Sequence, residues 1–239
     1  MMDLSKNLPR QEIKYKVFYK DLGKLYAWLS NTKFKKSFDN RNVNSLYYDT
    51  PSLDFASDNI AGDSKRIKIR ARWYSKFNEN IFHSFSKENQ SFNVEIKRKR
   101  NNLSDKILLA KFFFDTKNTL KDRRDFINDK VYFEISKHPE LLKLMIKDIV
   151  FVGYEREYYE NFISSKIRLT IDRNLVGSKV QSFFNFDKTL ISKNYVIVEL
   201  KFFKDSFQLV KNILDNIPFR QVRSSKYLYA LSKYQRFSY

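Results

Sequence analysis

The chain contains no cysteine and only two histidines, His83 and His138, among its 239 residues. The absence of cysteine excludes a disulfide framework and a thiolate metal site. The two histidines lie far apart in the sequence and lack ligand spacing, so a histidine-based zinc site or catalytic triad is disfavoured. Any bound metal would have to be held by carboxylates, which favours Mn or Mg as the cofactor.

Glycine and proline are also scarce, with four of each, fewer than disordered chains or tandem modules usually contain. Hydrophobic residues make up 42% of the chain, which is enough for a sizeable core. No apolar run approaches the roughly 18–20 residues that a membrane-spanning helix needs, and residues 1–16 lack the apolar centre of a signal peptide. We therefore predict one domain over residues 1–239, cytoplasmic and without a transmembrane segment.

Positive charge is what the chain has in excess. It carries 46 Lys and Arg against 27 Asp and Glu, a formal net charge of +19. Such an excess indicates a polyanionic partner, which can be a nucleic acid, an anionic membrane surface or a phosphorylated small molecule. Charge alone does not choose among these three classes.

The placement of the charges narrows the choice. The stretch Arg66–Arg72 has a cation at every second position and Ile or Ala between them. Successive side chains of a strand point to opposite faces, so the four cations would share one face. A surface strand can show this pattern once, but it recurs at Glu12–Lys14, Glu95–Lys97, Arg168–Asp172 and Glu199–Lys201. The repetition predicts a sheet with one charged face, which becomes a channel lining if the sheet closes.

The order of strand-like and helix-like segments predicts an α+β fold dominated by an antiparallel sheet. Residues 101–130 are rich in lysine and are interpreted as a helical insertion. Burying unpaired cations costs several kcal/mol each, so a channel this basic must stay wet or hold anions. A linear chain of phosphates suits it, whereas a nucleic-acid duplex is too wide for a barrel of about eight strands.

Two positions on these charged segments allow alternative interpretations. Glu199 lies in an otherwise apolar strand, where it is either an ion-pair partner of Lys201 or an arginine, or a ligand for a divalent metal. Ser225 and Lys226 fall in the first turn of a last helix capped by Ser224, where backbone N–H groups favour anions. The alternative for Lys226 is simple solvation.

Eight short motifs in this chain resemble, in the same order, those of one family. They are Arg10-x-Glu12-x-Lys14-Tyr15, Ser45–Pro51, Arg66–Tyr74, Glu95–Lys97, Tyr154–Tyr159, Arg168-x-Thr170-x-Asp172, Val198–Lys201 and Ser225–Tyr227. The family is the VTC domain, the polyphosphate polymerase domain of the vacuolar transporter chaperone complex, also found as stand-alone bacterial proteins. It belongs to the CYTH, or triphosphate tunnel metalloenzyme, superfamily, and the resemblance spans about residues 10–235.

This resemblance implies a closed eight-stranded antiparallel β-barrel tunnel with packing helices. It also implies ATP and polyphosphate as partners, with transfer of the ATP γ-phosphate onto a growing polyphosphate chain and release of ADP. The implied catalytic positions are Arg70, Arg72, Arg156, Arg168, Lys226 and Glu199, with Glu199 as the metal ligand for Mn or Mg. The expected phosphate-binding positions are Lys14, Arg66, Lys68, Lys97, Lys201, Arg223 and Ser225, with Glu12, Glu95 and Asp172 as supporting acids.

Three other functions are compatible with parts of the pattern. A triphosphatase or tripolyphosphatase on the same fold often begins Glu-x-Glu-x-Lys, whereas Arg10 stands at the first of these positions here. A non-catalytic polyphosphate or inositol-polyphosphate binding module would not need Glu199. A nucleic-acid binder would interleave outer-surface cations with exposed aromatics, and we expect no nucleic-acid partner. The oligomeric state is not determined by the sequence.

Overall fold

The computed structural model describes residues 10–77, 91–100, 103–114, 120–180, 189–192, 194–203 and 206–234. The strands are β1 (Arg10–Phe18), β2 (Phe34–Asp49), β3 (Lys65–Lys76), β4 (Ser91–Arg100), β5 (Leu103–Phe113), β6 (Lys147–Asn161), β7 (Arg168–Lys179), β8 (Thr189–Leu190) and β9 (Tyr195–Phe203). The helices are α1 (Leu22–Asn31), α2 (Asp54–Ala61), α3 (Leu120–Ser136), α4 (Pro139–Leu142), α6 (Phe207–Asp215) and α7 (Lys226–Leu231), with a 3-10 turn at Tyr19–Asp21.

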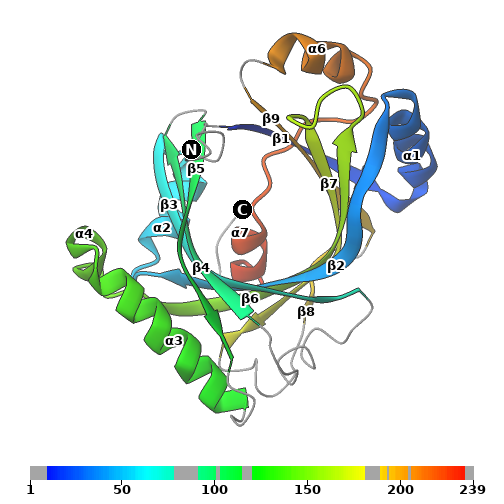
Figure 1. Cartoon of the computed structure of the whole chain (residues 1–239). Helices are drawn as coiled ribbons and strands as arrows, with labels where there is room; N and C mark the ends of the chain where they lie inside the picture. The colour runs from blue at the N-terminus through cyan, green and yellow to red at the C-terminus, as the bar shows by residue number, and fades with distance from the viewer. Residues whose placement is uncertain are drawn as a thin grey trace.

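The strands form one antiparallel sheet in the order β6-β2-β3-β4-β5-β1-β9-β7-β8, and β6 also pairs with β7. Figure 1 shows the sheet curving around a central space. The predicted antiparallel α+β sheet of eight long strands is therefore confirmed. Full closure into a barrel is not established, because β1 and β5 share one register pair, Arg10 with Ser104, among the described residues.

The convex face of the sheet is apolar and is covered by helices. On β3, Ile69, Ala71 and Trp73 alternate with the cations and pack beneath α3, which contributes Ile127 and Val131. Figure 1 shows α3 outside the sheet on this side and α1 and α6 outside it near β1, β9 and β7. The second apolar layer joins those strands to Leu25, Trp28 and Leu29 of α1 and to Val210 and Ile213 of α6. These two layers force the charged side chains of the alternating strands onto the concave face.

Helix α7 lies inside the curve of the sheet (Figure 1). Its residues Tyr227 and Leu228 pack against the concave sides of β2 and β6, and the Tyr227 ring stacks on Tyr47 with 5.2 Å between centroids. Close approach to β7 depends on Gly177, where an added Cβ would lie 3.0 Å from the Cβ of Ala230. Helix α7 therefore fills one sector of the concavity with apolar side chains.

The interpretation of residues 101–130 as a helical insertion is wrong for its central part. Residues Leu103–Phe113 form β5, which pairs with β4 along its length, and the helix α3 begins only at Leu120. The adjacent Leu108 and Leu109 interrupt the two-residue alternation that would have indicated a strand here. Residues 101–102 and 115–119 lie outside the described residues. Among the helices that are described, none is long and apolar enough to cross a membrane.

Candidate functional site

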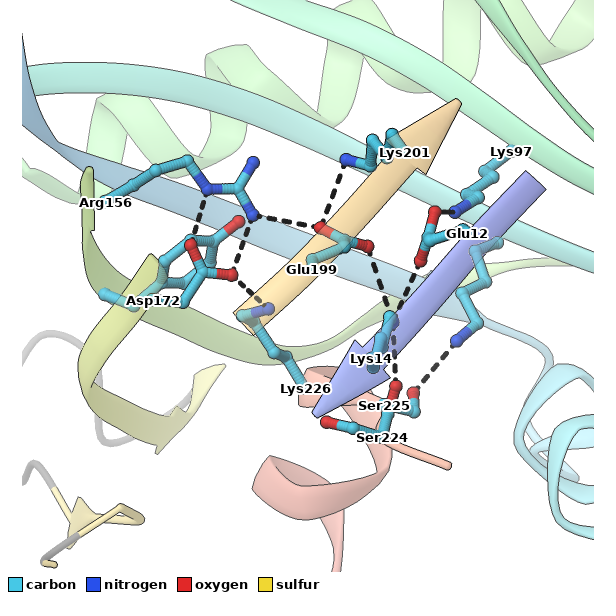
Figure 2. Close-up of polar contacts among 12 residues, drawn as sticks. Glu12, Lys14, Lys97, Arg156, Asp172, Glu199, Lys201, Ser224, Ser225 and Lys226 are labelled. Atoms are coloured by element: carbon cyan, nitrogen blue, oxygen red, sulfur yellow. Dashed lines mark hydrogen bonds and ion pairs between the residues drawn. The ribbon is translucent and has the colours of Figure 1, made fainter. Parts of the chain in front are cut away.

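Charged side chains from β1, β4, β6, β7, β9 and α7 meet on the concave face and form what we call the central cluster. It consists of Glu12, Lys14, Lys97, Arg156, Asp172, Glu199, Lys201 and Lys226 (Figure 2). Glu199 is only 5% exposed. Its carboxylate lies 3.1 Å from Lys201 Nζ, 3.6 Å from Lys14 Nζ and 3.5 Å from an Arg156 nitrogen. The cross-strand pairs Glu12–Lys201 and Lys14–Glu199 explain this convergence, because residues opposite each other in a sheet share a face.

Arg156 and Lys226 both hold Asp172. The Arg156 guanidinium makes two bonds to the Asp172 carboxylate, at 2.5 and 2.8 Å, and Lys226 Nζ lies 2.5 Å from the same group (Figure 2). Lys226 also lies 4.7 Å from the centre of the Tyr154 ring. Lys226 is therefore held inside the concavity, which contradicts the alternative of simple solvation.

Glu12 and Glu199 both lie against Lys14 and are kept charged by lysines. Glu12 lies 3.0 Å from Lys14 and 2.8 Å from Lys97. Burial alone would raise the pKa of Glu199, but Lys201 and Lys14 outweigh it and hold that pKa well below its usual range. Burial and Glu199 likewise oppose ionisation of Glu12, whose pKa is nevertheless lowered by Lys14 and Lys97. A carboxylate pair therefore persists at the centre of a basic surface.

A second group of charges lies beside the central cluster on β3, β4 and β5. Arg70 binds the Glu95 carboxylate at 2.8 and 2.9 Å, and Lys106 of β5 binds its other oxygen at 2.6 Å. Arg72 donates to the Ser45 hydroxyl at 3.1 Å and to the Tyr154 hydroxyl at 3.3 Å. Glu95 thus fixes Arg70, while Arg72 has hydroxyl partners on β2 and β6.

The Glu95 carboxylate predicts an acid-sensitive contribution to stability. Glu95 is 0% exposed; burial would raise its pKa, but Arg70, Arg72 and Lys106 outweigh it and lower that pKa from 4.5 to about 2. A depressed pKa stabilises the fold above pH 4.5, and this stabilisation is lost as the pH falls toward 2. We expect the unfolding free-energy difference between wild type and Glu95→Gln to be about 3 kcal/mol at pH 7 and to fall by more than half at pH 3. Urea unfolding at both pH values measures it, and an unchanged difference would contradict this account.

A cavity of 870 Å³ opens beside the central cluster, between β1, the start of β3, the end of β4 and the segments 59–64 and 221–225. Four of its cations, Arg66, Lys68, Lys99 and Arg223, have no carboxylate partner among the described residues. Burial, Lys14 and Lys97 lower the pKa of Lys68 well below its usual range, although Glu12 opposes this. The cavity wall therefore has positive charge that its own acids, Glu12 and Asp63, do not balance, as an anion-binding site requires.

Comparison with known proteins assigns this arrangement to a family. The sequence model of the VTC domain matches residues 9–234. The chain belongs to the VTC domain family. This confirms the resemblance drawn from the eight motifs. The chain matches no curated protein sequence.

The solved structures that are similar to this chain have low sequence identity to it. The Schizosaccharomyces pombe Mediator head module matches with a TM-score of 0.53, 9% identity and coverage of 90% of this chain and 98% of that chain. The PH1819 protein of Pyrococcus horikoshii matches with a TM-score of 0.49 and 14% identity, with coverage of 93% of this chain and 99% of that chain. The triphosphatase of the mimivirus capping enzyme matches with a TM-score of 0.42 and 11% identity, with 87% of each chain covered. At these identities the Mediator match concerns the fold alone.

The VTC domain's carboxylates can supply part of a metal site. Among the described residues, no group of three or more His, Asp or Glu side chains is placed to hold a metal ion. Glu12 and Glu199, which both lie against Lys14, are the two acids that could hold a divalent cation, since Mg²⁺ is commonly bound through one or two carboxylates. The supporting acid Asp172 contacts Arg156 and Lys226 instead.

Two predicted site residues lie differently from the expectation. Arg168 is on the concave face opposite Lys201, but it is exposed at the start of β7 and donates to the Ser165 carbonyl at 3.2 Å. It is therefore not brought into the central cluster. Ser225, not Ser224, caps α7, and it accepts hydrogen bonds from Lys68 at 2.9 Å and Asn59 at 3.1 Å. With only six residues, α7 offers no helix N-terminal anion site, so Ser225 acts through its hydroxyl.

Several residues of the concave face were missed by the sequence analysis. They are Ser45, Tyr47, Lys99, Lys106 and Tyr154. Ser45, Tyr47 and Lys99 continue the two-residue alternation of their strands, so the same rule could have found them. Lys106 could not be found in this way, because its strand was interpreted as a helix.

Proposed function

We propose that this VTC domain is a metal-dependent polyphosphate polymerase that transfers the γ-phosphate of ATP onto a polyphosphate chain in a basic tunnel. The observation that carries the proposal is the continuous basic surface formed by the cavity and the central cluster, with the Glu12–Glu199 pair at its centre. Membership of the VTC domain family supports the same reaction class. A cytoplasmic location is part of this proposal.

The residues would divide the work as follows. Arg66, Lys68 and Arg223 would bind the phosphate chain in the cavity, with Lys99 as a further contact. Arg70, Arg72, Arg156 and Lys226 would neutralise the transferred phosphate. Glu199 with Glu12 would hold Mn²⁺ or Mg²⁺, which would supply further neutralisation of the phosphate charge. The end of the accepting chain is already an anionic nucleophile, so positioning and charge neutralisation suffice without a general base.

The second candidate is a triphosphatase or tripolyphosphatase on the same fold. Hydrolysis needs an acid to hold or activate water as well as a metal. On β1 only Glu12 serves as a concave-face acid, because Arg10 stands where those enzymes often have a first Glu. The carboxylates around Glu199 are also bound by lysine and arginine, which favours phosphate binding over water activation.

The products decide between these functions. We expect purified protein with ATP and Mn²⁺ to form polyphosphate, seen as a ladder on a gel, together with one ADP for each phosphate added. The same assay includes a measurement of free phosphate. Free phosphate without polymer would identify the hydrolase, and neither product, with polyphosphate binding retained, would leave a binding module.

A further inference from the structure

An aromatic cluster lies where the basic row on β3 ends. Alternate residues of β3 share a face and lie about 6.6 Å apart along the strand. Tyr74 therefore follows Arg70 and Arg72 on the concave face. The Arg41 guanidinium lies between two rings, 4.5 Å from the centre of Tyr74 and 4.7 Å from that of Tyr158. Its Nε also donates to the Tyr158 hydroxyl at 3.0 Å. Arg41 therefore fixes both tyrosine rings in place.

Phe38 is the exposed member of this cluster. Its ring meets the Tyr158 ring nearly edge-on, with 6.0 Å between centroids and 85° between planes, while 61% of the residue is exposed. Single exposed aromatics are common on protein surfaces, so exposure alone indicates nothing. The location of Phe38 is more informative, because Phe38 packs on Tyr158, which Arg41 holds in place, beside the central cluster.

The aromatic cluster adjoins the central cluster through β2 and β6. Arg41 pairs with Arg156 in the sheet register, and the Arg156 guanidinium carbon lies 6.0 Å from the Tyr158 ring centre. A triphosphate held by Arg72 and Arg156 would thus have a flat aromatic surface at one end and the cavity cations at the other. A substrate made of phosphate alone makes no use of the aromatic end.

We propose that Phe38, supported by Tyr158 and Arg41, is the stacking surface for the base of a nucleoside triphosphate whose phosphates bind at Arg72 and Arg156. This inference rests on the proposed function. Aromatic rings and arginine planes bind bases by stacking, which tolerates different bases because each has a π-face. The site would therefore distinguish a nucleotide from inorganic tripolyphosphate.

The test compares two ligands and two exposed phenylalanines by calorimetric titration. We expect Phe38→Ala to weaken ATP binding about tenfold or more and to leave tripolyphosphate binding unchanged. The matched control is Phe162→Ala, since Phe162 is 72% exposed on the turn after β6 and should affect neither ligand. Phe38→Trp should retain ATP binding, and its added fluorescence should be quenched by ATP but not by tripolyphosphate.

The outcomes separate this inference from the function on which it rests. Equal effects of Phe38→Ala on ATP and tripolyphosphate, or no effect on either, would overturn the base-stacking role while leaving the phosphate site intact. Wild-type protein that binds neither ligand would overturn the proposed function and the stacking role together.

Discussion

Replacing Glu199 by glutamine is expected to lower the rate of phosphate transfer from ATP by about 100-fold or more. The substitution keeps the shape of a buried side chain but removes the charge that faces Lys14, Lys201 and Arg156. It also leaves Glu12 as the only carboxylate of the Glu12–Glu199 pair, so a divalent cation would be held more weakly. Initial rates of ADP formation measure the effect, and Mn²⁺ binding followed by electron paramagnetic resonance gives a readout independent of turnover.

The matched control is Glu160→Gln. Glu160 is an acid of β6 that forms a partly exposed ion pair with Lys35 at 3.8 Å. Such surface ion pairs contribute little to stability, and Glu160 lies outside the central cluster. We therefore expect neither the rate nor Mn²⁺ binding to change appreciably. Equal rates for Glu199→Gln and wild type would show that Glu199 takes no part in the reaction.

Replacing Arg156 by methionine is expected to lower the free energy of unfolding by about 3 kcal/mol. Methionine keeps an unbranched apolar stem and part of the packing, but Asp172 loses two hydrogen bonds in a buried position. Lys226 remains to balance part of the Asp172 charge, which limits the loss. Urea unfolding measures the change directly, and a domain of this size should lose roughly 6–12 °C in Tm.

Arg168→Met provides the comparison for this second prediction. This substitution removes the same charge as Arg156→Met. Arg168, however, is exposed at the first residue of β7, and its guanidinium binds only a backbone carbonyl among the described contacts. The free energy of unfolding of Arg168→Met should differ from that of the wild type by no more than about 0.5 kcal/mol. If both variants lost the same stability, the buried Arg156–Asp172 pair would not be the source of the effect.

The alternation of charged and apolar residues predicted the concave face well. One strand, β3, carries Arg66, Lys68, Arg70 and Arg72 on one side and the apolar core residues on the other. The same two-residue rule placed Glu12, Lys14 and Glu199 on that face. The two-residue period is enough to predict which side chains share the concave face, because a strand with one buried side permits only one register.

Other features depended on contacts that a linear pattern does not contain. The strand β5 escaped notice because Leu108 and Leu109 are adjacent and a register shift at Val94–Glu95 breaks the pairing. The exposed place of Arg168 depends on where β7 begins in the sheet. The packing of α7 inside the concavity requires Gly177, whose role appears only when Ala230 lies against it. Long-range packing, not local preference, fixes each of these.

The position of bound phosphates tests the account most directly. A crystal structure of the wild-type protein with tripolyphosphate and Mn²⁺ would locate both, because Mn²⁺ gives an anomalous signal. We predict phosphates on the concave face, contacting Lys68 and Arg72, and a Mn²⁺ ion between them and the Glu12–Glu199 pair. Phosphates bound only to the convex face or outer helices, with Glu199 still paired only with lysine and arginine, would contradict the assignment of this surface as the active site.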